Sequence, residues 1–256
     1  MKILFLGDIV GATGREIVLS HLANIKRDND IDLVIANGEN SAHGKGITSK
    51  IYRQLISGGV DVITLGNHAF SKGEILNTMH ECPKLIRPQN LLGYTSGKGY
   101  ITVTVDDLSV TIVNLCGKVF MDLVDKNPYD TMDDILNEVK SDIYFVDIHA
   151  EATAEKSIFW NYFKEKVQIV VGTHTHVQTA DERIECGSAF ISDVGMCGSY
   201  YSILGRDTEE VLKYVIYKER THYTPSVGPA ILCGVIIEID NESKKAVKID
   251  RLQIRP

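Results

Sequence analysis

Short runs of branched aliphatic residues recur along the chain, and most are followed by a glycine-containing turn and then by a helical pattern. The first run, KILFLG, is continuously apolar, as expected of a strand buried on both faces. The next segment, REIVLSHLANIKRDN, places Ile17, Val18, Leu22 and Ile25 on one side of a helix. IDLVIANG and VDVITLG then repeat the strand pattern. The alternation of strands and helices predicts an α/β fold.

Local signals predict the boundaries of several further elements. Thr48 is expected to cap a second helix, and Thr131 to open a later one as part of a capping box. GYITVTVDDLSVTIVNLCG has the alternation of a hairpin that turns at Asp106–Asp107, and the last part of the chain predicts another hairpin with its turn near 241–242. DIYFVDIHA and VQIVVGTHTH predict two more strands.

The chain shows no internal repeat and no linker rich in proline or serine. We therefore expect one domain that covers residues 1–256, a length that a single α/β domain can reach. The least regular segments lie around 118–130 and 199–229. Because functional loops are often irregular, these two segments are candidates for a cap over a site.

Composition and charge narrow the class of protein. The hydrophobic content of 44% is ordinary for a globular protein and supplies a sizeable core. A formal net charge of −7 argues against bulk nucleic-acid binding and against adhesion to anionic membranes. The cysteines are scattered and never spaced as CxxC, which favours reduced thiols. Because the amino terminus is too short to be a signal peptide and no apolar run could span a bilayer, we expect a cytoplasmic protein.

Polar side chains stand just past the predicted core strands, at the point where each strand ends. They belong to the strings GD, GEN, GNH, DIHAE and GTHTH: Asp8, Glu39, Asn40, Asn67, His68, His149, His174 and His176. In open α/β sheets, ligands bind at the carboxyl ends of the strands. Carboxylate, amide and imidazole donors without thiolates suit Mn, Fe, Zn or Mg better than a structural zinc site. The number of donors exceeds what one ion uses and matches two ions about 3.5–4 Å apart.

Taken singly, several of these residues have a structural explanation. Asp8 could cap the following helix, Asn67 could occupy a left-handed turn, and His149 could be a hydrogen-bonded core histidine. His174 and His176 are harder to explain in this way, because residues two apart point in the same direction on an extended backbone. The coincidence at five strand ends favours a metal site.

In their order along the chain, GD, GEN, GNH and GTHTH resemble the motifs of the calcineurin-like metallophosphoesterase superfamily. The longer strings FLGDIVGATGRE, NGENSAHGKGIT, ITLGNHAF, DIHAEATAEK, GTHTHVQTAD and ISDVGMCGSYYSILG resemble its bacterial YmdB-like phosphodiesterase branch, over nearly the whole chain. The resemblance implies a two-sheet β-sandwich core flanked by helices, with a binuclear metal site at one end. It also implies hydrolysis of small phosphodiesters, including 2′,3′-cyclic nucleotides such as 2′,3′-cyclic AMP. Iron is the favoured metal, with manganese, zinc or magnesium as alternatives, and a homo-oligomer is compatible with the family.

Carried over residue by residue, the resemblance implies two sets of metal ligands that a bridging Glu39 joins: Asp8, Asn40 and His176 for the first ion, and Asn67, His149 and His174 for the second. His68 would be the general acid. The superfamily usually has a histidine where this chain has Val10, so Asn40 would complete the first set. The acidic residue that often follows the GNH motif is replaced by Ala69, so His68 must be oriented in another way.

The expected reaction is attack on phosphorus by a metal-bridging hydroxide, while His68 protonates the leaving alkoxide. Alternatives are a metal-dependent amidase, a monoester phosphatase, and a metal-binding regulatory protein with little catalysis. A dinucleotide-binding oxidoreductase fits less well. Gly7, Gly11 and Gly14 are spaced GxxxGxxG rather than GxGxxG, and Asp8 would face the pyrophosphate.

Overall fold

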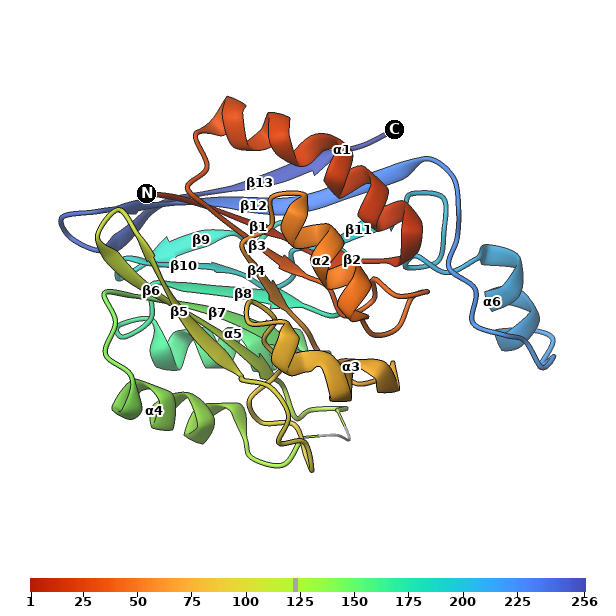
Figure 1. Ribbon diagram of the computed structural model, residues 1–256, viewed down its shortest axis with the longest axis horizontal. Coiled ribbons are helices and arrows are strands. Elements are labelled where there is room, and N and C mark those ends of the chain that lie inside the picture. The colour runs from red at the N-terminus through yellow and green to blue at the C-terminus, as the bar shows by residue number, and fades with distance from the viewer. Residues whose placement is uncertain (122–123) are drawn as a thin grey trace.

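The computed structural model of the protein describes residues 1–121 and 124–256. Residues 122–123, which fall in the predicted cap segment 118–130, lie outside the described residues. The described residues form two mixed β-sheets that lie face to face, with helices on both outer faces (Figure 1). This arrangement confirms the predicted α/β fold with a core of two packed sheets.

The first sheet contains both ends of the chain. Its strands run in the order β2–β11–β12–β1–β3–β4, and β13 pairs with β12. Their bounds are β1 Lys2–Leu6, β2 Asp8–Ile9, β3 Leu33–Asn37, β4 Val62–Thr64, β11 Met196–Ser199, β12 Ala230–Asp240 and β13 Lys245–Ile254. Because β1, β3 and β4 are mutually parallel, the segments that follow them leave the sheet at the same edge.

The second sheet runs in the order β5–β6–β7–β8–β10–β9. The bounds are β5 Tyr100–Val105, β6 Leu108–Cys116, β7 Ile143–His149, β8 Ile169–Thr173, β9 Arg183–Glu185 and β10 Ser188–Ile191. β6, β7 and β8 are parallel, with His149 opposite Thr173 in the register. The last residues of β7 and β8 therefore end side by side.

Helices cover the outer faces of both sheets. Their bounds are α1 Gly11–Asn29, α2 Ser49–Ser57, α3 Gly73–Thr78 with the 3₁₀ turn Met79–Glu81, α4 Pro128–Glu138, α5 Thr153–Phe163 and α6 Thr208–Val215. α1 and α2 pack on the first sheet, whereas α4 and α5 pack on the second, where Trp160 stacks on Phe190. Over the described part of the chain, no helix is both long and apolar enough to cross a membrane.

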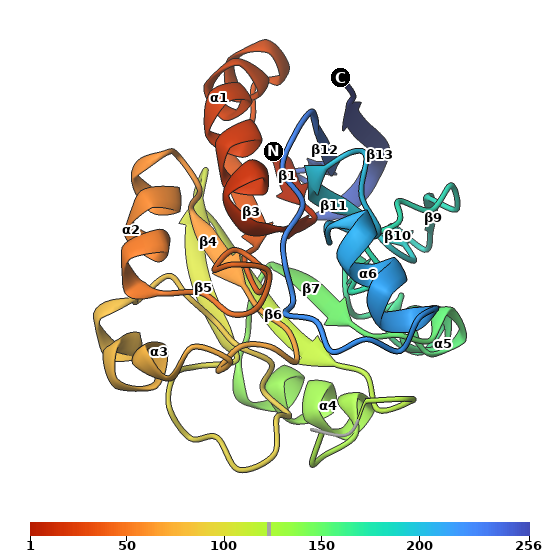
Figure 2. The ribbon, with the colours of Figure 1, turned by 90° about the vertical axis from the view of Figure 1, so that its right-hand side faces the viewer.

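Apolar side chains from both sheets fill the space between them. Phe5 of β1 lies against Phe145 of β7, with ring centroids 5.5 Å apart, and both side chains are fully buried. At one end of this core the apolar residues give way to buried polar ones, among them Asp8, Asp147 and His149. α6 and the irregular segments around it project at one end of the molecule, which Figure 2 shows face on.

Most local boundary predictions hold. Thr48 caps α2, since its hydroxyl accepts a hydrogen bond from the backbone N–H of Ile51. The first hairpin turns at Asp106–Asp107, where both residues have positive φ, and the second turns between β12 and β13. The prediction for α4 was wrong. This helix begins at Pro128, and Asn127 caps it by accepting a hydrogen bond from the N–H of Asp130, because Asn precedes a proline that suits the first helical position.

Candidate metal centre

The predicted site residues leave five strands of the two sheets. Asp8 follows β1 after Gly7, Glu39 and Asn40 follow β3, Asn67 and His68 follow β4, His149 ends β7, and His174 and His176 follow β8. Thus three strands of the first sheet and two of the second supply the side chains. The structure brings all eight residues to the polar end of the core.

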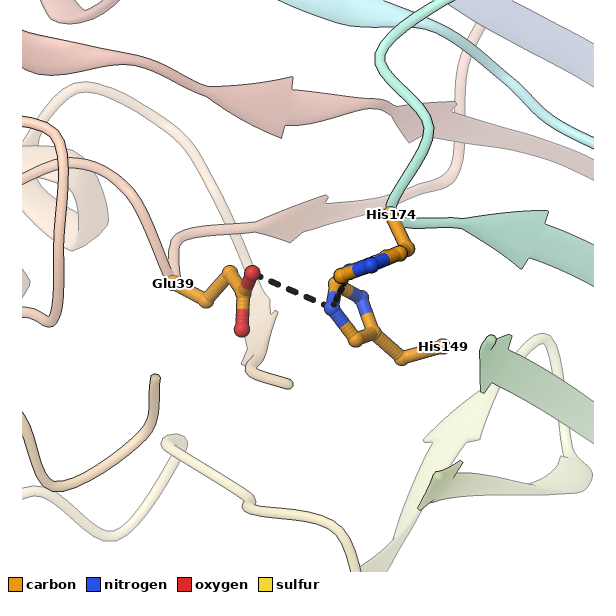
Figure 3. A group of neighbouring side chains, drawn as sticks. All are labelled: Glu39, His149 and His174. Carbon is orange, nitrogen blue, oxygen red and sulfur yellow. Dashed lines mark hydrogen bonds and ion pairs between the residues drawn. The ribbon is translucent and has the colours of Figure 1, made fainter. Parts of the chain in front are cut away.

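His149 lies at the centre of one group of donors. Its Nε2 atom is 3.0 Å from Glu39 Oε1, 2.9 Å from His174 Nδ1 and 3.1 Å from Asn67 Oδ1. One ligand atom from each of Glu39, His149 and His174 lies within 4.8 Å of the other two, and Figure 3 shows the three side chains turned toward one another. This spacing is what a shared cation would require of its ligands.

Asp8, Asn40 and His176 form a second group beside the first. His176 Nε2 lies 3.2 Å from Asn40 Oδ1 and 3.8 Å from Asp8 Oδ1. Asp8 Oδ2 accepts a hydrogen bond from the backbone N–H of His174, whereas Asp8 Oδ1 is buried and has no hydrogen-bond partner among the described residues. A buried carboxylate oxygen without a donor is costly unless a cation lies beside it.

Burial also sets the protonation of these groups. It raises the pKa of Asp8 above its ordinary value, although His176 and His149 act in the opposite direction. It lowers the pKa of His149 to about 4, and burial together with the neighbouring His149 lowers the pKa of His174 to about 4. Neutral imidazoles offer the lone pairs that metal ions bind. The residues present therefore fit metal ions, with the donor types that the sequence predicts.

The backbone expected at His174 and His176 was wrong. The two residues are not extended, since φ is 104° at His174 and 65° at His176, and β8 ends before them at Thr173. The chain bends at each histidine, so the His174 ring meets His149 while the His176 ring meets Asn40. Such conformations are rare for non-glycine residues and persist where the surroundings enforce them, commonly at functional sites.

The sequence did not predict the groups that contact the second ring nitrogen of His174 and of His176, the nitrogen that faces away from the other donors. Glu151 Oε2 lies 3.0 Å from His174 Nε2, and the carbonyl oxygen of Leu204 lies 2.9 Å from His176 Nδ1. Each partner fixes the ring nitrogen opposite the one that faces the donor group. The DIHAE string contains Glu151 and offered a signal. Leu204 acts through its backbone, for which no side-chain signal exists.

Gly66 shows how closely the chain approaches the donors. A Cβ atom at this position would lie 2.2 Å from Glu39 Oε2 and 2.3 Å from His149 Nε2. Any side chain at position 66 would therefore displace the donor group, and only glycine fits there.

A cleft of about 350 Å³ opens above the donors. It is lined by Glu39, Asn40, Lys45, His68, His174, His176, Leu204, Arg206 and Tyr223. Two cations lie over the ring of Tyr223, with Lys45 Nζ 5.1 Å and the Arg206 guanidinium carbon 4.6 Å from its centroid. Three of the lining residues, Leu204, Arg206 and Tyr223, come from the predicted cap segment 199–229. A larger hollow of about 680 Å³ lies beside β5, but none of the predicted ligands lines it.

Comparison with known proteins agrees with the fold and the motifs. The family model of YmdB-like proteins matches residues 4–252. The chain is 43% identical over 257 residues to the 2′,3′-cyclic-nucleotide 2′-phosphodiesterase of Bacillus subtilis (strain 168), across 99% of this chain and 97% of the relative.

Two of the solved structures that match the whole chain are 36–37% identical to it. A crystal structure described as a novel phosphatase from Mycoplasma pneumoniae superposes with a TM-score of 0.95 at 37% identity and covers 100% of this chain and 93% of its own. A hypothetical protein from Thermus thermophilus matches with a TM-score of 0.93 at 36% identity, over 100% of this chain and 99% of its own. The resemblance seen in the sequence is confirmed, and the chain belongs to the family of YmdB-like proteins.

Proposed function

We propose that this protein is a metal-dependent phosphodiesterase that hydrolyses small phosphodiesters, with 2′,3′-cyclic nucleotides as the substrate class. The observation that carries the proposal is the convergence of Glu39, His149 and His174 below an open cleft, beside a buried Asp8 oxygen that has no hydrogen-bond partner in the described part of the chain. The cyclic-nucleotide substrate is inferred from the B. subtilis relative, a 2′,3′-cyclic-nucleotide 2′-phosphodiesterase to which this chain is similar over nearly its full length.

The residues of the site would have different roles in such a reaction. Asp8, Asn40 and His176 would hold one ion, Asn67, His149 and His174 would hold the other, and Glu39 would bridge the two. The bound ions would supply Lewis acidity toward the phosphoryl group and an acidified water at neutral pH. Iron remains our preferred metal, with manganese, zinc or magnesium as alternatives.

His68 lines the cleft and is the proposed general acid. Its backbone N–H donates to Glu39 Oε2 at 3.1 Å, which fixes the start of the side chain next to the donor group. Ser71 Oγ lies 3.5 Å from His68 Nδ1, a long contact that orients the ring only weakly in place of the missing acidic residue after the GNH motif. Burial lowers the pKa of His68 below its ordinary value, and the nearby Glu39 offsets only part of this shift, so the net direction runs against the protonated form that an acid needs.

The first experiment is hydrolysis of bis-p-nitrophenyl phosphate and 2′,3′-cyclic AMP by protein reconstituted with manganese or iron. We expect turnover of both diesters, loss of turnover when a chelator removes the metal, and recovery when metal is restored. The His174→Ala protein should bind less metal, whereas His80→Ala, which changes an exposed histidine outside the cleft, should behave as the unmodified protein. Turnover that survives chelation, or a strong preference for p-nitrophenyl phosphate, would contradict the proposal.

Lys45 is the cation that we expect to bind the substrate phosphate. It lies at the mouth of the cleft beside Tyr223, in an otherwise acidic protein. We expect Lys45→Gln to raise KM for 2′,3′-cyclic AMP by about tenfold, the lower end for a hydrogen bond to a charged group, and to change kcat little. Lys50→Gln, on the exposed side of α2, is the matched control. Equal KM values for the two variants would remove Lys45 from substrate binding.

A further inference from the structure

A chain of buried hydrogen bonds runs from the metal-facing ring of His149 into the core between the sheets. His149 Nδ1 lies 2.9 Å from Thr173 Oγ1, and Thr173 Oγ1 lies 2.7 Å from Asp147 Oδ1. Asp147 and His149 are two residues apart on β7, and Thr173 is the register partner of His149 on β8. All three side chains are completely inaccessible to solvent.

The partners of Asp147 determine the direction of these hydrogen bonds. Its other oxygen, Oδ2, accepts hydrogen bonds from Thr64 Oγ1 at 2.5 Å and from Asn37 Nδ2 at 3.1 Å. Asn37 must use its amide here, because its own carbonyl oxygen accepts the backbone N–H of Glu39 at 3.1 Å. Three donors therefore converge on one carboxylate. Burial raises the pKa of Asp147 to about 7, and in its ionised form the carboxylate accepts from all three donors.

This direction sets the tautomer of His149. Because the Thr173 hydroxyl donates its single proton to Asp147, its oxygen can only accept from His149. The proton of the neutral ring then lies on Nδ1, and the lone pair on Nε2 faces Glu39, Asn67 and His174. A protonated Nε2 in that place would block the binding of a metal ion.

The same carboxylate also reaches the first sheet. Through Asn37 at the end of β3, Asp147 is linked to the backbone of Glu39, whose carboxylate contacts His149. Through Thr64 it is linked to the end of β4, which leads to Asn67. One side chain of the second sheet thus contacts both first-sheet strands that supply donors to the His149 group.

We propose that Asp147 is a positioning residue of the metal centre: through Thr173 it fixes the tautomer and orientation of His149, and through Asn37 it fixes the backbone at Glu39. The inference rests on the proposed metal centre and concerns residues that touch no substrate. It goes beyond the ligand set, because neither Asp147, Thr173 nor Asn37 offers a free atom to an ion. Partners of ligating histidines generally act in this way.

The test measures the ring tautomer and metal affinity separately from hydrolysis. Histidine ring ¹⁵N shifts of the metal-free protein, assigned with the His149→Ala spectrum, report which nitrogen of His149 carries the proton. Calorimetric titration with Mn²⁺ reports affinity. Thr173→Val has nearly the same shape but lacks the hydroxyl, and we expect its Mn²⁺ affinity to fall about 10–100-fold, with loss of the pure Nδ1–H tautomer. Thr173→Ser, which keeps the hydroxyl, should restore both.

Thr64→Val is the matched control, because it removes a hydroxyl from the same carboxylate without touching His149. It should keep the Nδ1–H tautomer and lose much less Mn²⁺ affinity than Thr173→Val does. Asp147→Asn gives a second, opposite signal. Because Asn37 must still donate to an oxygen, the carbonyl oxygen of the new side chain faces Asn37 and its NH₂ group faces Thr173. The NH₂ group then donates to the Thr173 hydroxyl, which in turn donates to His149 Nδ1. The ring proton of His149 therefore moves to Nε2.

The proposal is overturned if Thr173→Val binds Mn²⁺ as tightly as Thr64→Val and keeps the Nδ1–H tautomer. If Thr173→Val does not fold, the tautomer of the Asp147→Asn protein decides in its place, and an unchanged Nδ1–H form overturns the proposal. Absence of phosphodiesterase activity in the unmodified protein would contradict the proposed function only, since the tautomer and the Mn²⁺ titration do not depend on turnover.

Discussion

The His68→Ala protein is expected to keep its metal ions and to turn over 2′,3′-cyclic AMP about 10²–10⁴-fold more slowly, the usual contribution of a general acid. The structure indicates why turnover should fall while metal binding is kept. The link between His68 and the donor group is the backbone N–H that donates to Glu39 Oε2, and removal of the ring leaves this hydrogen bond in place. The ring itself lines the cleft, where a leaving alkoxide would need a proton.

The leaving group provides the internal comparison. A ribose alkoxide is a poor leaving group without a proton, whereas p-nitrophenolate leaves as a stable anion. The loss in kcat should therefore be much smaller with bis-p-nitrophenyl phosphate, while metal content measured by elemental analysis stays unchanged. Ser71→Ala, which removes only the long contact to Nδ1, should have a small effect on both substrates. Equal turnover of 2′,3′-cyclic AMP by His68→Ala and the unmodified protein would exclude His68 as the acid.

The fold could be predicted because the same strand and helix patterns recur along the sequence. Continuous apolar runs such as KILFLG require a strand covered on both faces, and the helical stripe of Ile17, Val18, Leu22 and Ile25 supplies one cover. The alternation of apolar and polar residues predicted the hairpins, and Asp106–Asp107 marked the first turn because aspartate tolerates positive φ. The start of α4 was missed because Asn127 and Pro128 give a stronger local signal than the Thr131 capping box.

The candidate site was predictable in outline for a different reason. Parallel strands deliver their last residues to one edge, so polar residues past several strands must meet, whatever the detailed backbone. The bends at His174 and His176 could not be read, because positive φ at a histidine depends on tertiary contacts. Asp147 and Thr173 were missed for a similar reason. Within a buried strand they look like ordinary polar residues until the register places Thr173 beside His149.

From the sequence, the segment 199–229 could be recognised only as an irregular one. Arg206 and Tyr223 reach the cleft through folding of residues 199–229, and Lys45 comes from the loop after β3. Gly44 has φ of 82°, and a Cβ atom there would lie 2.2 Å from the Tyr223 ring, so the ring rests directly on the backbone. No local pattern links residues 44 and 223, which lie far apart in the sequence.

Replacement of Lys156 by methionine is expected to destabilise the metal-free protein by about 3–5 kcal/mol, because it leaves a buried charge without its partner. Lys156 on α5 is 1% exposed, and its Nζ donates to Asp193 Oδ2 at 2.8 Å and to the carbonyl oxygen of Thr173 at 2.9 Å. Asp193 Oδ2 also accepts the backbone N–H of Thr175 at 3.0 Å. The pair therefore holds the chain on both sides of His174.

Urea unfolding at fixed pH, followed by circular dichroism, measures this loss. Lys166→Met is the matched control, since Lys166 is exposed and lies 3.6 Å from Asp133, a surface pair that contributes about 0–1 kcal/mol. Because the Lys156–Asp193 pair holds Thr173 and Thr175, Lys156→Met should also weaken Mn²⁺ binding in the fraction that remains folded, whereas Lys166→Met should not. A stability loss no larger than that of Lys166→Met would show that the buried pair is dispensable. The bends at His174 and His176 would then have to be held by other contacts, among them Asp8, Glu151 and the carbonyl oxygen of Leu204.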